Sequence, residues 1–247
     1  MSKLPKAPLI EVIAELSWIT NTPEELEKFR FLLGNMYIKL KDKYPLRINL
    51  VQIPLAGMEV PLDVFKNKPV YRFRKNENSY PIYQLGPGLL SVNTINETYI
   101  WEDFEKEVLD VFAKFKESYD FNPSSTFDIA LKYLDFYPFD FNHNAYSFLK
   151  DNLHLQIIHS MQSEKHNPSF VNFATGHKEN TGQFNFSINR GMIQLKGEGF
   201  LVETSLKNKI ILDSDVDISS WLNSAHEYLS TVFKDMTKGA MYDSFFN

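Results

Sequence analysis

Two amphipathic helices, each with a tryptophan near its start, constrain the fold of this chain more than any other feature. The first is predicted over 99–119 and contains Trp101, and the second starts near residue 217 and contains Trp221. The tryptophans lie 120 positions apart in a chain of 247 residues, which is about half of its length. This spacing predicts an internal duplication, with two unrelated α+β subdomains as the alternative.

The first half opens with a strand predicted over 8–18. A helix follows from Pro23, because Thr22 is a suitable N-cap and Glu25 completes a capping box. The apolar stripe of this helix is predicted to be Leu26, Phe29, Leu33, Met36 and Leu40. Further strands are predicted at 47–53, 69–75, 80–85 and 89–93, with a tight turn at 86–88.

The second half shows a similar order of elements. A strand over 127–137 precedes a short helical piece at 145–149. The strands predicted after it are 154–159, 169–174, 183–189, 192–196 and 200–206. Turns are predicted at 180–182, at Gly191 and at 197–199.

These patterns predict an α+β fold. The halves 1–122 and 123–247 would each contribute a strand, a helix, antiparallel strands and a final helix to one compact unit. The expected result is a curved antiparallel sheet with helices packed on one face. Its topology resembles the saddle-shaped folds related to the TATA-binding protein, a comparison of shape that implies no function.

Composition excludes several classes of protein. The chain has no cysteine, which excludes disulfides, thiolate catalysis and cysteine-ligated zinc. Its formal net charge of −5 argues against a nucleic-acid binder that uses its whole surface. There is no signal peptide pattern and no apolar run of the roughly 18 residues that a membrane helix needs, so we expect a cytoplasmic protein without membrane contact.

The familiar catalytic motifs are missing from the sequence. It contains no P-loop, no Gly-x-Ser-x-Gly elbow and no His-Glu-x-x-His pair. The six histidines have no spacing typical of a metal site. We therefore predict no cofactor, no metal and no catalytic residue, and an enzyme with an unfamiliar site is the third alternative for function.

The most distinctive charged segment is 66–75, with five basic residues in ten positions and no acid. On a strand, Arg72 and Arg74 share one face and Tyr71 and Phe73 the other. The segment is a candidate phosphate-binding ribbon for nucleic acid or a nucleotide, or a dock for an acidic partner. The alternative is a solvent-exposed edge strand whose charged side chains prevent it from pairing with a strand of another molecule. The candidate binding residues are Lys66, Lys68, Arg72, Arg74 and Lys75.

Three segments carry a family resemblance. They read KAPLIEVIAELSW at 6–18, QLGP at 84–87 continuing to YIWEDF at 99–104, and LKYLD at 131–135. Together they resemble a sporadically distributed prokaryotic family of uncharacterised proteins of similar length. At the third segment the family has an Arg-Tyr-x-Asn pattern, which Lys132 and Asp135 replace here. Lysine lacks the planar guanidinium group, so Lys132 does not reproduce a bidentate role of the family's arginine. Lys132 and Asp135 are candidates either for a binding site or for a structural ion pair with Glu11 and Glu15.

The leading hypothesis is a non-catalytic protein that binds another protein through its sheet or through exposed helical faces. The sporadic distribution of the family implies an accessory or regulatory role beside bacterial defence or toxin genes. The aromatic residues on the helices are expected to pack in a core between helices of one chain, and the alternative is that part of them forms a homodimer interface. The second hypothesis is a nucleic-acid- or nucleotide-binding module that uses segment 66–75.

Overall fold

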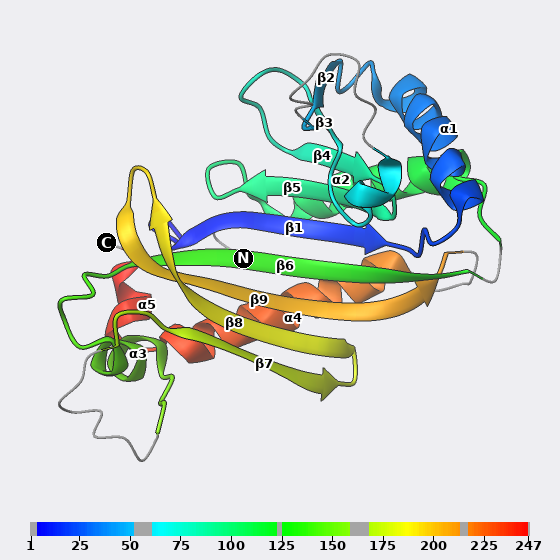
Figure 1. The fold of residues 1–247 in the computed structure, drawn as a ribbon. Helices are drawn as coiled ribbons and strands as arrows, with labels where there is room; N and C mark the ends of the chain where they lie inside the picture. The colour runs from blue at the N-terminus through cyan, green and yellow to red at the C-terminus, as the bar shows by residue number, and fades with distance from the viewer. Residues whose placement is uncertain (1–3, 52–60, 123–124, 159–167, 213–216, 247) are drawn as a thin grey trace. The chain divides into compact units, whose positions relative to one another are not determined.

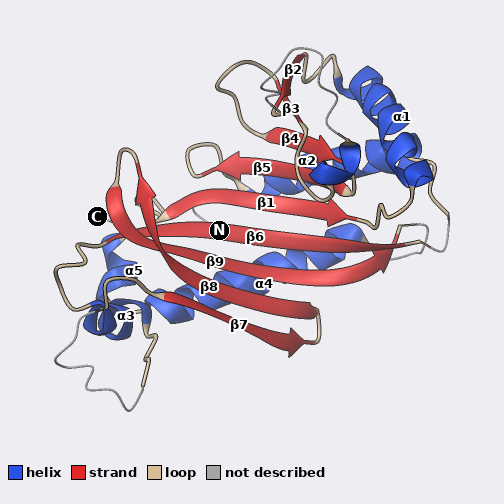
Figure 2. Cartoon of the chain, in the orientation of Figure 1, coloured by secondary structure: helices blue, strands red, loops and turns tan. Residues whose placement is uncertain are grey.

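The computed structural model describes residues 4–51, 61–122, 125–158, 168–212 and 217–246 (Figure 1). Within these ranges the chain is an α+β protein whose strands form one large antiparallel sheet (Figure 2). The strands are β1 Leu9–Ser17, β2 Leu46–Asn49, β3 Tyr71–Arg74, β4 Ile82–Gly86, β5 Leu89–Ile95, β6 Thr126–Pro138, β7 Asn172–Glu179, β8 Gly182–Ile193 and β9 Gly197–Ile211. The helices are α1 Pro23–Leu40, η1 Leu62–Phe65, α2 Trp101–Ser118, α3 Ala145–Leu153, α4 Ile218–Thr237 and α5 Ala240–Ser244. The predicted α+β class is confirmed.

The order of the strands in the sheet is β2-β3-β4-β5-β1-β6-β9-β8-β7. The opening strands of the two halves, β1 and β6, are therefore neighbours, and each is followed outward by the later strands of its own half. Alternation along β1 predicts that Ile10, Val12, Ala14 and Leu16 share the inner face; Val12, Ala14 and Leu16 are fully buried, and Ile10 is half-buried.

Helix α1 begins where the sequence predicts. The Thr22 hydroxyl accepts a hydrogen bond from the Glu25 backbone N–H at 3.2 Å, which satisfies one of the free donors of the first turn. The buried stripe differs from the predicted one, because Leu32 is buried and Leu33 is only half-buried. At 100° per residue both positions lie on the inner side of the helix, and packing against the rest of the chain decides between them.

The second half differs from prediction at its turns. Gly191 lies inside β8, and the β8–β9 turn falls at 194–196 rather than at 197–199. The region 154–158 is not a strand, and residue 159 lies outside the described ranges, as do 52 and 53 of an earlier predicted strand. Sequence patterns also missed η1 and α5, since elements of four or five residues carry too little periodicity to detect.

The chain divides into two compact units. Unit 1 comprises Met1–Glu11, Lys132–Leu206 and Asn223–Asn247, and unit 2 comprises Val12–Leu131 and Lys207–Leu222. In unit 1, α4 packs on the sheet through the Phe184 and Tyr228 rings, whose centroids are 5.5 Å apart. In unit 2, the Trp18 ring lies 4.9 Å from that of Phe115 on α2. Large rings thus fill both cores.

Both tryptophan-containing helices are present. Trp101 is the first residue of α2 and is half-buried, whereas Trp221 lies in the first turn of α4 and is buried. Neither these nor any other described helix has the length and apolarity needed to cross a membrane.

Candidate binding surfaces

The sheet of unit 1 has one core face and one exposed polar face. On β8, Phe184 and Ile188 are buried, while Asn185 and Ser187 between them are only half-buried on the opposite face. The register pairs Ser187 with Ala174 of β7. Small and polar residues therefore lie side by side on the face that points away from the core.

A depression of about 350 Å³ opens on this polar face. Its lining comes from three strands and comprises Ala174, Thr175, Gly176, Asn185, Phe186, Ser187 and Glu203. The depression exists because β7 carries almost no side chain there. A Cβ built on Gly176 would lie 2.8 Å from Gln183 Nε2 and 3.2 Å from Asn185 Oδ1.

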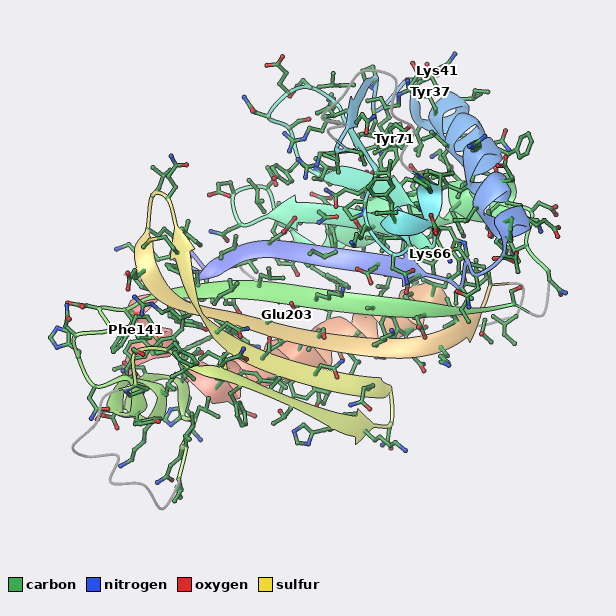
Figure 3. All side chains as sticks on the ribbon, viewed as in Figure 1. Tyr37, Lys41, Lys66, Tyr71, Phe141 and Glu203 are labelled. Carbon is green, nitrogen blue, oxygen red and sulfur yellow. The ribbon has the colours of Figure 1, made fainter. Side chains whose placement is uncertain are left out.

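Glu203 is the only charged residue that lines the depression. It is half-buried on β9, on the face of the strand toward the viewer in Figure 3 and away from α4. Its carboxylate makes no hydrogen bond or ion pair with any residue that the structure describes. A half-buried carboxylate attracts cations more strongly than one in bulk water. A cationic group with N–H donors, such as a lysine or arginine side chain, can bind it through charge-assisted hydrogen bonds.

The basic segment 66–75 is only partly a strand. Arg72 and Arg74 lie on β3 and share a face, as predicted, but both guanidinium groups already have partners within unit 2. With the Gln84 amide oxygen turned toward it, Arg72 donates from Nε at 3.0 Å and from Nη2 at 2.9 Å. Arg74 donates to the backbone oxygen of Glu77 and lies 5.3 Å from the Tyr80 ring centre.

The three lysines of the segment lie outside the strand. Lys66 is half-buried at the end of η1, and Lys68 and Lys75 are exposed. None of the three forms an ion pair with a described residue. The structure therefore separates the five basic residues into two arginines with partners in unit 2 and three lysines without an ion pair among the described residues, of which Lys68 and Lys75 are exposed.

Lys132 and Asp135 do not meet. They are three residues apart on β6, and a strand alternates its faces, so their side chains point to opposite sides of the sheet. Lys132 is half-buried, whereas Asp135 is only 4% exposed and shares the core face with Tyr133 and Tyr137. Burial raises the pKa of the Asp135 carboxyl to about 7. Asp135 is therefore a buried titratable group and does not belong to a surface site with Lys132.

Two of the described histidines contact polar groups of their own unit. His154 ends α3 in the left-handed conformation, with φ of 49°, and its Nε2 lies 2.9 Å from the Lys238 backbone oxygen. His226 Nδ1 on α4 lies 2.7 Å from the Tyr133 hydroxyl. Two further histidines, at positions 159 and 166, lie outside the described ranges. Within the described ranges, no three His, Asp or Glu side chains are grouped to hold a metal ion.

Sequence reasoning missed the depression, although part of its signal was present. Polar Gln183, Asn185 and Ser187 alternate with apolar residues, which predicts a strand with one polar face. Glu203 interrupts the apolar run of β9 in the same way. The pairing of β7, β8 and β9 is what brings these residues together, and a single sequence does not reveal it.

Comparisons with known proteins found no match for this chain among protein families, curated proteins or solved structures. The family resemblance of the three sequence segments therefore stays a prediction.

Proposed function

We propose that this protein is a non-catalytic binding protein that recognises another protein through the exposed sheet face of unit 1. In this proposal, the depression around Glu203 receives a lysine or arginine side chain of the partner. The observation that carries the proposal is the half-buried Glu203 carboxylate without a partner among the described residues. An arginine fits this site well, because its guanidinium can donate two parallel hydrogen bonds to one carboxylate.

The character of the depression favours a protein over a small molecule. Small-molecule pockets are mostly apolar and enclose most of their ligand. This depression is open and lies on an extended sheet face, and its lining residues include one amide, two hydroxyl groups and one charge. A side chain that projects from a folded partner needs only such a shallow, polar receptor.

The test is binding with and without the Glu203 charge. The products of genes next to this one are the first candidates, because the family resemblance predicts an accessory role beside defence or toxin genes. We expect Glu203→Gln to weaken capture of such a partner at least tenfold, since a hydrogen bond to a charged group is worth about 1.5–3 kcal/mol. Glu227→Gln, at an exposed position of α4, is the matched control. Equal binding by both variants would refute the role of Glu203.

A second candidate function is nucleic-acid binding by the basic segment 66–75. The exposed Lys68 and Lys75, with Lys66, favour it, since solvated lysines can approach phosphates without losing an internal bond. Binding to heparin or single-stranded RNA should then fall steeply with salt. Replacing the three lysines by glutamine should reduce that slope, and binding that does not depend on salt would exclude this function.

We also infer that the two halves arose by duplication. Support comes from the strand order, in which β1 with β5, β4 and β3 is mirrored by β6 with β9, β8 and β7. In each half the opening strand is followed by a helix, and a tryptophan-containing helix follows the last strand of the half.

A further inference from the structure

Helix α1 carries an unusual apolar stripe on its exposed side. Phe31 is 72% exposed and Ile38 is 65% exposed, although both are large hydrophobic residues. They are seven positions apart, so they lie on the same face of the helix. The opposite face of α1 carries the buried residues Phe29, Leu32, Met36 and Leu40. Helix α1 is therefore apolar on two sides, and only one of them is covered by its own unit.

The covered side is fixed by α2. Lys39 Nζ lies 2.7 Å from Glu117 Oε2, and Asn35 Nδ2 donates to the Ser118 backbone oxygen at 3.2 Å. These contacts set the rotation of α1 about its own axis, so the stripe with Phe31 and Ile38 cannot turn inward without breaking them.

Gly34 lies between Phe31 and Ile38 on the same stripe. A glycine inside a helix costs about 1 kcal/mol relative to alanine. Packing within the described residues does not require it, because a Cβ built on Gly34 would have no atom within 4 Å outside its chain neighbours and the backbone of its own helix. A glycine at the centre of an exposed apolar stripe is what a second helix needs to approach closely.

Charges at the two ends of the stripe have opposite signs. Glu24 and Glu27 are exposed in the first turns, where the Glu27 carboxylate also lies 3.6 Å from Arg30 Nη1, and Lys41 is exposed just after the last turn. Figure 3 shows Lys41 beside Tyr37 at this end of α1. Glu27 and Lys41 each lie seven residues from Gly34. Two copies of the stripe that run in opposite directions therefore place the acidic end of one against the basic end of the other.

We infer that α1 packs against α1 of a second copy of this chain, antiparallel, with the two-fold axis near Gly34. Phe31 then faces Ile38 of the second copy, and Glu27 faces Lys41 of the second copy. A parallel arrangement would instead place Glu27 against Glu27 and Lys41 against Lys41. Two-fold interfaces use the same patch on both subunits, and this stripe has the required self-complementarity.

The association is expected to be weak and reversible. One helix pair buries less than the roughly 1,000 Å² typical of stable interfaces. The test is therefore sedimentation velocity of the full chain at protein concentrations up to about 1 mM, the weak end of measurable affinities. We expect a concentration-dependent monomer–dimer equilibrium. A monomer at every concentration would overturn the inference.

Charge reversal tests the partner and the register together. In an antiparallel dimer, Glu27→Lys or Lys41→Glu each turns two attractive pairs into repulsive ones and should weaken the dimer about tenfold. The double variant E27K/K41E restores both pairs and should dimerise like the original protein. A double variant as weak as the single ones would overturn the antiparallel register.

Two further variants separate the interface from general effects. Gly34→Leu should abolish dimerisation while leaving the circular dichroism spectrum unchanged, because the monomer has open space at this position. Lys106→Glu, an exposed charge reversal on α2, is the matched control and should dimerise normally. Equal weakening by Lys106→Glu would show that net charge, rather than this stripe, governs the association.

Discussion

The sheet is covered differently in the two units. In unit 2, β5 is buried on both faces, from Leu89 to Thr94, including the polar residues Ser91 and Asn93. In unit 1, the exposed face of β7 and β8 stays open, and the Glu203 depression lies on it. The strands of the two units thus differ in whether the chain itself occupies their second face.

At the β4–β5 turn of unit 2, the cover comes from the segment that leads into β3. The Asn67 backbone N–H donates to the Pro87 oxygen at 2.8 Å, next to the β4–β5 turn. A Cβ built on Gly86 would lie 1.8 Å from the Lys68 backbone oxygen. A sheet face is accessible to a binding partner only where no connecting segment of the chain covers it. The open face of unit 1 is for that reason our candidate for function.

The largest expected effect tests the covered face against the open one. Gly86→Ala should destabilise the protein by about 3 kcal/mol, because backbone would have to move to make room for the methyl group. Gly176→Ala should change stability by less than about 0.5 kcal/mol, since its neighbours are the mobile ends of Gln183 and Asn185 side chains. Urea unfolding measures both. Similar losses at the two glycines would remove the distinction between the faces.

The next effect concerns one buried carboxyl group in unit 1, compared with a neutral buried pair in unit 2. Ser91 Oγ donates to Asn93 Oδ1 at 2.8 Å, whereas Asp135 is buried with its pKa raised from 3.8 to about 7. A raised carboxyl pKa stabilises the fold at low pH. That stabilisation is complete below about pH 4 and is lost as the pH rises to about 7.

Asp135→Asn should remove this pH dependence. At pH 8 the variant should be more stable than the original protein, and at pH 4 the two should be similar. Thermal unfolding across this pH range measures the difference. Asp128→Asn on the same strand, where the carboxylate lies 3.0 Å from Lys207 Nζ, is the control and should not gain stability at high pH. A wild-type pH profile in the Asp135 variant would contradict the burial of an ionised group.

A smaller effect should be equal in both units. The hydroxyl groups of Tyr83 in unit 2 and Tyr137 in unit 1 are buried without a hydrogen-bond partner in the described part of the chain. Burial raises the pKa of both. Phenylalanine at either position should stabilise the protein by about 1 kcal/mol, because an unsatisfied buried polar group is removed. Differential scanning calorimetry of the two variants measures this, and destabilisation of one alone would reveal a partner for that hydroxyl.

The smallest effect should be that of Glu203→Gln on stability. Its carboxylate has no partner among the described residues, so the midpoint of thermal unfolding should stay within the change expected for about 0.5 kcal/mol. A large loss would mean that Glu203 supports the fold instead of a ligand.

The elements were predicted best where their local signals are long and strong. Thr22 and Pro23 start α1, and the 13 residues of β6 form the strand expected at 127–137. The turn predicted at Gly191 was wrong because a glycine inside a strand resembles a turn signal. In β8, a Cβ built on Gly191 would lie 3.3 Å from the Leu201 side chain. The basic segment was visible in the sequence, but the contacts of Arg72 and Arg74 with neighbouring residues were not.

The sequence by itself determined the fold class and the absence of disulfides, because alternation, helix caps and cysteine content are local properties. Tertiary structure decided which faces stayed open. Only strand pairing placed Gly176, Asn185 and Glu203 around one depression, and only packing on α2 left Phe31 and Ile38 exposed. Burial and strand pairing depend on residues that are far apart in the chain, so the local patterns of a single sequence do not predict them.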